Sequence, residues 1–141
     1  MVDTSVLVSA MIGSTFANRD ILRACLERRV QPLIGETLFL EYEDVLSRPQ
    51  LMARSPLSIS ERQRLLEAFL AVCRWVEVYF GWRPNLPDEA DNHLIELAVA
   101  GGANWIVTSN VADFRRSELK FPQIRVGTAM EFMAFLGKEV L

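Results

Sequence analysis

Apolar positions along the chain follow a helical repeat in several stretches and form short continuous runs between them. The clearest helical stretch runs from Pro87 to the glycine pair at 101–102. At about 100° per residue, its apolar stripe consists of Leu94, Ile95, Leu97, Ala98 and Val99. A short apolar run, Trp105–Val107, follows the glycines and leads into a polar segment that ends near Asp113. This pattern predicts a turn, an amphipathic helix, a buried strand and an acidic loop.

The same analysis predicts short strands and helices that alternate along the rest of the chain. Strands are expected at Val30–Ile34, Trp75–Tyr79 and Ile124–Val126, with the end of a strand and a turn at Met1–Ser5. Helices are expected at Val6–Ile12, from an Asn18 cap to Arg29, from Glu36 or Thr37 to Ser47, from the Ser58–Glu61 capping box through Val72, and from the Thr128–Glu131 capping box to Gly137. Loops are expected at Pro49–Ser60 and Gly81–Pro87. Such alternation is typical of βαβ units, so we predict a parallel sheet with helices on both faces.

Acidic residues stand at corresponding points of these units. Asp3 follows the first strand, Asp91 begins the helix after Trp75–Tyr79, and Asp113 follows Trp105–Val107. Ligands of open parallel sheets bind at the carboxyl ends of the strands. The three carboxylates are therefore expected at one rim of the sheet.

Each acid also has a structural interpretation when taken alone. Asp3 suits a turn, Asp113 suits a loop cap, and acids at a helix start are favoured by the helix dipole. Asp91 differs because it lies near the middle of the apolar stripe, where a charge needs compensation. Glu41 or Glu43 can add a fourth carboxylate, and helical periodicity does not choose between them.

Several carboxylates gathered without a nearby lysine cannot all remain ionised unaided. A hard divalent cation removes the repulsion, and Mg²⁺ or Mn²⁺ takes oxygen ligands and retains water. Such an ion activates water and stabilises charge on a phosphoryl oxygen. The acidic positions therefore predict metal-dependent phosphodiester hydrolysis.

Composition narrows the class of protein. The 141 residues and the hydrophobic fraction of 50% suit one domain over residues 1–141 with a substantial core. The net charge of −3 argues against a general nucleic-acid coat protein, but not against an enzyme acting on nucleic acid. Among the arginines, Arg115 and Arg116 follow the acidic loop and are candidates for phosphate contact.

The remaining special residues indicate a cytoplasmic protein. Cys25 and Cys73 are expected to be reduced core thiols. The single histidine, His93, points away from the apolar stripe and is expected at the surface. We see neither a secretory leader nor an apolar run near the roughly 20 residues that a membrane span needs.

The order and wording of these motifs resemble the PIN-domain ribonucleases, in particular the VapC-like toxins of toxin–antitoxin pairs. The segment Asp3-Thr-Ser-Val-Leu resembles the opening motif of that family. The segment from Glu41-Tyr to Pro49 resembles the second motif, in which the Glu before Tyr is the acidic site residue. The most specific likeness is Asp88-Glu-Ala-Asp91 through Thr108, and there Asp91 falls on the third acidic position.

This resemblance implies a three-layer α/β/α PIN-like fold around a central parallel sheet of about four to five strands. It implies that Asp3, Asp91 and Asp113 hold Mg²⁺ or Mn²⁺ and that Glu41 acts beside them. It implies that Ser5, Thr108 and Ser109 orient carboxylates by hydrogen bonds. Asn110 and Arg115, which lie beside them in the sequence, are further candidates for substrate contact. The family cleaves RNA, is often dimeric, and is commonly inhibited by an antitoxin protein.

Two departures from the family pattern support an alternative. Asn110 stands where many relatives carry Asp, and only Met1 and Val2 precede Asp3 where relatives have a longer first strand. The alternative is a catalytically weak or inactive PIN-like module that binds nucleic acid or regulates a partner. A receiver-like phosphotransfer domain ranks below both, because no lysine stands at a strand end opposite the acids.

Overall fold

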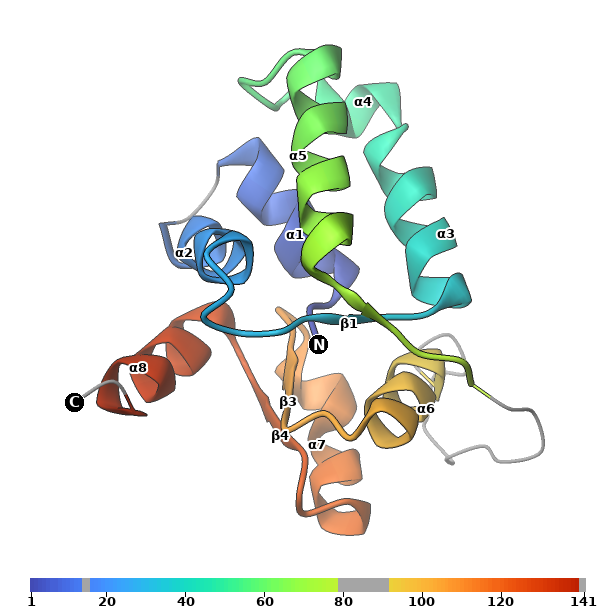
Figure 1. Ribbon diagram of the computed structural model, residues 1–141, viewed down its shortest axis with the longest axis vertical. Helices are drawn as coiled ribbons and strands as arrows, with labels where there is room; N and C mark the ends of the chain where they lie inside the picture. Colours follow the sequence, from blue (N-terminus) through green and yellow to red (C-terminus); the bar gives the residue numbers. More distant parts are fainter. Residues whose placement is uncertain (14–15, 79–91, 140–141) are drawn as a thin grey trace.

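The computed structural model of the chain describes residues 1–13, 16–78 and 92–139 (Figure 1). The helices are α1 (Thr4–Ile12), α2 (Phe16–Leu26), α3 (Glu36–Leu46), α4 (Pro49–Met52), α5 (Ile59–Val72), α6 (Asn92–Gly101), α7 (Val111–Lys120) and α8 (Ala129–Glu139). The strands are β1 (Leu33–Ile34), β2 (Arg74–Trp75), β3 (Trp105–Val107) and β4 (Arg125–Gly127). Strands and helices alternate over much of the chain, which agrees with an α/β fold.

All strand pairings of the described residues are parallel. β1 pairs with β2, and β3 pairs with β4. The first residues of the chain lie along the other edge of β3: Asp3 N donates to Val107 O at 2.9 Å, and Val107 N donates to Met1 O at 2.8 Å. β3 is therefore flanked on both sides by parallel neighbours. The described strands form two two-stranded sheets, so the predicted sheet of about four to five strands stays a prediction.

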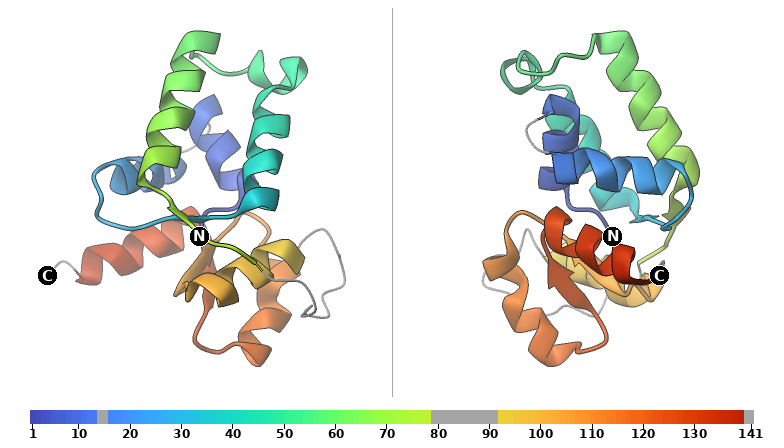
Figure 2. Two further views of the ribbon diagram at one scale, coloured as in Figure 1. Left: turned by 45° about the vertical axis from the view of Figure 1, so that its right-hand side comes forward. Right: turned by 90° about the vertical axis from the view of Figure 1, so that its left-hand side faces the viewer.

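The helices lie on two sides of these strands. In both views of Figure 2, α1 to α5 lie on one side and α6 and α7 lie on the other, whereas α8 packs against α2. α6 packs against β1, β3 and α3, and so connects the two sheets. The first turns of α1 and α6 both reach the middle of α3, where Thr4 and His93 contact Glu41. No helix within the described ranges has the length and apolarity to cross a membrane.

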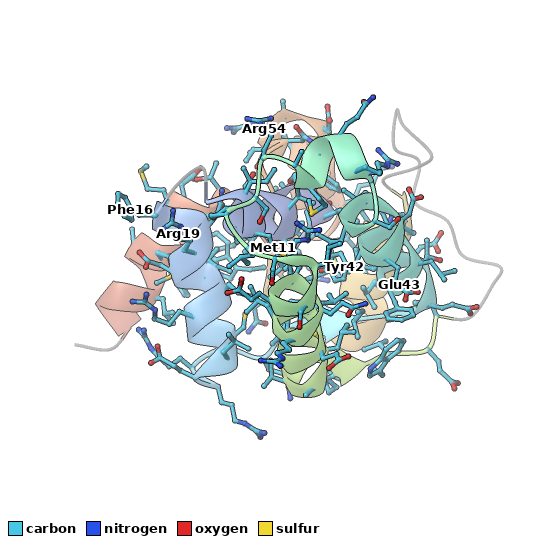
Figure 3. The ribbon with its side chains drawn as sticks, turned by 90° about the horizontal axis from the view of Figure 1, so that it is seen from above. Met11, Phe16, Arg19, Tyr42, Glu43 and Arg54 are labelled. Carbon is cyan, nitrogen blue, oxygen red and sulfur yellow. The ribbon has the colours of Figure 1, made fainter. Side chains whose placement is uncertain are left out.

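The interior between the helices is apolar and is anchored by Tyr42. Its side chain is fully buried, packs edge-on against Phe69 with ring centroids 6.0 Å apart, and donates a hydrogen bond from its hydroxyl to Val2 O. Figure 3 shows Tyr42 on α3 among the helices, whereas Glu43, the next residue, is exposed. The buried hydroxyl ties α3 to the residue directly before Asp3.

Several predicted boundaries are confirmed by their local geometry. Gly13 ends α1 in the left-handed conformation (φ 78°), which an L side chain rarely adopts. Ser58 and Glu61 form the predicted reciprocal capping box at the start of α5. Thr128 and Glu131 exchange the corresponding hydrogen bonds before α8.

Other boundaries were predicted wrongly. Asn18 is not a cap but a buried residue inside α2, which begins at Phe16 and ends at Leu26. The segment predicted as a loop from Pro49 contains α4, because Pro at the first helical position has its φ already set for a helix. The acidic loop predicted around Asp113 is the first turn of α7.

The two ends of the chain also differ from the prediction. Gly137 does not end α8, which continues to Glu139. The expected turn at the end of Met1–Ser5 is replaced by α1, since Asp3 caps that helix. The predicted loop at Gly81–Pro87 lies outside the described residues.

Candidate active site

The buried carboxylate of Asp3 is the centre of the site. Asp3 is the N-cap of α1 and is 7% exposed. Its Oδ1 accepts a hydrogen bond from Thr4 N at 2.8 Å. Its Oδ2 accepts from Thr108 Oγ1 at 2.6 Å and from Ser5 Oγ at 3.3 Å. Thr108, which directly follows β3, is fully buried. The carboxylate is therefore fixed at the carboxyl ends of two adjacent parallel segments.

The turn after β3 is joined to this network through its backbone. Ser109 N donates to Ser5 Oγ at 3.2 Å, and Asn110 N donates to Thr108 Oγ1 at 3.0 Å. The Ser109 and Asn110 residues are exposed. Ser5, Thr108, Ser109 and Asn110 are thus brought to Asp3, the first two through side-chain bonds to its carboxylate.

Asp3 is surrounded by donors that carry no charge. Burial raises the pKa of the Asp3 carboxyl most strongly, and the nearby Glu41 charge raises it further. The hydrogen bonds from Thr108, Thr4 and Ser5 oppose this and lower the pKa. No ion pair within the described part of the chain involves Asp3. Its charged form is therefore held in a poorly solvated place, where no positively charged side chain of the described residues is paired with it.

Glu41 is a second carboxylate held beside Asp3. Its Oε1 accepts from Thr4 Oγ1 at 2.7 Å, and its Oε2 lies 3.0 Å from His93 Nε2. The hydrogen bond from His93 is the largest cause that lowers the pKa of Glu41, and burial opposes it. Thr4 touches both carboxylates, through its backbone N–H and its hydroxyl. Of the two glutamates that periodicity left open, Glu41 lies in this network, whereas Glu43 is exposed.

His93 was predicted wrongly as a surface residue. Its side chain is 18% exposed and contacts Glu41. The prediction used the angle from the apolar stripe, but His93 lies in the first turn of α6, where the helix end meets α3. Thr4 was not among the predicted site residues. The available signal was its hydroxyl in the Asp-Thr-Ser motif, next to the predicted acid.

Two other predicted site residues lie apart from this network in the described part of the chain. Asp113 is exposed in the first turn of α7, and its N–H donates to Asn110 O at 3.1 Å. Arg115 is exposed on the same helix. Asp91, predicted as a metal ligand, lies outside the described residues, and α6 begins at the next residue, Asn92.

The donor chemistry fits a hard divalent cation. Two carboxylates from separate elements lie close enough for the charge on Glu41 to raise the pKa of Asp3. Carboxylate oxygens are the ligands that Mg²⁺ and Mn²⁺ prefer. A group of three or more metal-binding side chains is not found among the described residues, so Asp113 does not complete a set with Asp3 and Glu41.

An apolar cavity in the described part of the chain lies elsewhere. It has a volume of about 370 Å³ and is lined by residues such as Ile21, Leu33, Trp105 and Phe132. None of the acidic residues described above lines it. The candidate site is therefore the polar network around Asp3, not this cavity.

Comparison with known families identifies the family of the chain. A model of the PIN domain matches residues 1–112, which include Asp3, Glu41 and Asp91. Searches of curated proteins and of solved structures give no match. PIN domains are generally nucleases and typically use divalent metals, so the match supports a nuclease module. With the matched region covering most of its length, this chain belongs to the PIN domain family.

Proposed function

We propose that the protein is a metal-dependent endoribonuclease that hydrolyses RNA phosphodiester bonds as the toxin of a toxin–antitoxin pair. The observation that carries the proposal is the Asp3 carboxylate, which is buried, is bonded by the neutral donors Thr4, Ser5 and Thr108, and is adjacent to the second carboxylate of Glu41. Keeping the Asp3 carboxylate both buried and ionised costs free energy. A cation bound to this carboxylate offsets that cost.

The proposed metal ligands are Asp3 and Asp91, whereas Asp113, the third ligand that the resemblance implies, lies apart from Asp3 and Glu41 in the described part of the chain. A bound Mg²⁺ or Mn²⁺ supplies water activation and charge stabilisation at the phosphate. Asp3 is prepared for this task because Thr108 and Ser5 fix one of its oxygens and Thr4 fixes the other. Ligands that are held by such partners bind metals more tightly than free side chains.

Other residues have roles toward the substrate in this proposal. Glu41 is held at the edge of the site, where its carboxylate can orient the attacking water and accept its proton. Ser109 and Asn110 are exposed beside Asp3 and present polar side chains to the sugar–phosphate chain. Arg115 is exposed two residues beyond Asp113 and suits phosphate contact.

The biological setting is proposed from the resemblance of the motifs to VapC-like toxins. We propose RNA as substrate, an antitoxin protein as partner, a homodimer, and a cytoplasmic location. A gene for a short protein next to this one, whose product binds the chain and suppresses RNA cleavage, is the expected finding. Cleavage that is unaffected by the neighbouring product would argue against the toxin role.

Activity is tested with RNA oligonucleotides in the presence of Mg²⁺ or Mn²⁺. We expect cleavage that stops in EDTA, and that falls by about 10²-fold or more in Asp3→Asn and Asp91→Asn. Glu43→Gln is the matched control, because Glu43 is an exposed acid on the same helix as Glu41. Cleavage that persists in EDTA, or that survives in Asp3→Asn, would overturn the metal-dependent mechanism.

A catalytically inactive nucleic-acid-binding module is the second candidate. It is favoured by Asn110, which carries an amide where many relatives have a carboxylate, and by the separation of Asp113 from the Asp3 network. RNA binding that is equal in wild-type protein and Asp3→Asn, without cleavage in either, would support it.

A further inference from the structure

The Glu41 carboxylate is hydrogen-bonded on two sides by residues that are distant in the sequence. Thr4, at the start of α1, donates to Oε1 at 2.7 Å. His93, in the first turn of α6, lies 3.0 Å from Oε2 through its Nε2. Because an ionised carboxylate only accepts hydrogen bonds, Nε2 carries the proton in this contact. Each oxygen of Glu41 thus has its own donor.

Stability alone is a weak reason for this pair. The side chains of His93 and Glu41 are 18% and 38% exposed, and ion pairs that solvent reaches contribute little to folding. Orientation is a stronger reason. A glutamate side chain has several torsions, and with only Thr4 as partner its second oxygen can rotate away from the site.

The residue that follows Glu41 also holds the site in place. Tyr42, which follows Glu41, bonds through its hydroxyl to Val2 O, next to Asp3. α3 is therefore fixed to the strand end that carries Asp3, and His93 fixes the remaining freedom of Glu41 itself. A carboxylate that must meet a water and a phosphate benefits from such placement, since small displacements of catalytic groups slow reactions strongly.

We propose that His93 is a positioning residue that holds the Glu41 carboxylate in its working orientation for phosphodiester hydrolysis. This inference rests on the proposed nuclease function. His93 acts through Glu41 and does not itself contact the RNA. The essential property of His93 is therefore a hydrogen-bond donor at the place of Nε2.

The kinetic test compares His93→Leu, which removes the donor, with His93→Gln, whose side-chain amide can donate from a similar place. For His93→Leu we expect kcat to fall about 10–100-fold, the usual effect of losing such a partner, while KM for RNA changes less than about 2-fold. His93→Gln should restore kcat to within about 5-fold of wild type. Glu96→Gln, on the same helix, is the control and should behave as wild type.

Two kinetic outcomes would overturn the inference. A wild-type kcat in His93→Leu would show that the His93–Glu41 hydrogen bond is not needed for the reaction. A loss in His93→Leu that His93→Gln does not repair would show that the imidazole itself is required, and not only a donor to Glu41.

A second measurement needs no RNA cleavage. The chain has a single histidine, so its ring-nitrogen NMR signals belong to His93 without further assignment. We expect the Nε2–H form in the wild-type protein, and a clear shift of the ring-nitrogen signals in Glu41→Gln but not in Glu43→Gln. Unchanged signals in Glu41→Gln would show that His93 and Glu41 are not hydrogen-bonded, and would overturn the inference.

The two proposals can fail separately. Absence of RNA cleavage in the wild-type protein, with the His93 signals responding to Glu41→Gln, would reject the nuclease while the His93–Glu41 contact stands. Cleavage by the wild type, with no response of the signals, would reject the role of His93 while the nuclease stands.

Discussion

Replacing Thr108 by valine tests how the chain keeps a buried carboxylate in place. Valine has nearly the same shape as threonine, so packing at this fully buried position is preserved and only the hydroxyl is lost. That hydroxyl donates to Asp3 Oδ2 at 2.6 Å and accepts from Asn110 N at 3.0 Å. The substitution therefore removes one bond to a charged group and one neutral bond.

The expected size follows from these two bonds. A hydrogen bond to a charged group contributes about 1.5–3 kcal/mol to stability, and a neutral one about 0.5–1.5 kcal/mol. The free energy of unfolding should therefore fall by about 2–4.5 kcal/mol at neutral pH. For a chain of 141 residues, 1 kcal/mol corresponds to about 3 °C in Tm, so Tm should fall by roughly 6–14 °C.

The assay is thermal and urea unfolding followed by circular dichroism, without divalent ions. Thr128→Val is the matched control, because Thr128 bonds to Glu131 in an exposed capping box, where the cost is about 1 kcal/mol. If Thr108→Val lost no more stability than Thr128→Val, the Asp3–Thr108 hydrogen bond would not stabilise the fold to the extent predicted here.

Three further predictions concern the same region. Tyr42→Phe removes the hydroxyl that bonds to Val2 O and leaves a buried carbonyl without this donor, so the unfolding free energy should fall by about 1–3 kcal/mol. Urea titrations measure this change, and an unchanged midpoint would contradict the bond. Because burial raises the pKa of Asp3 in the folded state, the folded protein retains that proton longer than the unfolded chain, so the metal-free protein should lose stability as pH rises through and above the ordinary value of 3.8. Asp3→Asn should remove this loss, and an equal pH dependence in both proteins would refute it. The lowered pKa of Glu41 acts in the opposite sense: its contribution is present above the ordinary value of 4.5 and is lost as pH falls through the lower folded value, which Glu41→Gln should abolish in acid titrations of Tm.

The elements that sequence could predict are those with local causes. The apolar stripe of α6 predicts its buried face, and Leu94, Ile95, Leu97 and Ala98 are all buried. Gly13 and the two capping boxes mark helix ends through bonds between near neighbours in the chain. Asp3 could be placed at a strand end because the strand and the following polar motif are adjacent in sequence.

The parts that sequence missed depend on tertiary contacts. Asn18 has the chemistry of a cap, yet it is buried inside α2, so packing prevails over its local preference. His93 lies off the apolar stripe of its own helix, but its partner Glu41 is supplied by α3. α7 was missed because its sequence is strongly polar and offers few apolar residues to mark a buried face. In each case the deciding neighbour is far away along the chain, or the local pattern is weak.

Titration of the metal-free protein with Mn²⁺, by calorimetry or by the electron paramagnetic resonance signal of the free ion, tests the central claim most directly. If acidic side chains gather around a divalent cation at Asp3, the wild-type protein and Glu43→Gln will bind Mn²⁺ in the same way, and Asp3→Asn will bind it at least about 10-fold more weakly. Absence of Mn²⁺ binding in the wild type, or equal affinity in Asp3→Asn, would contradict the account.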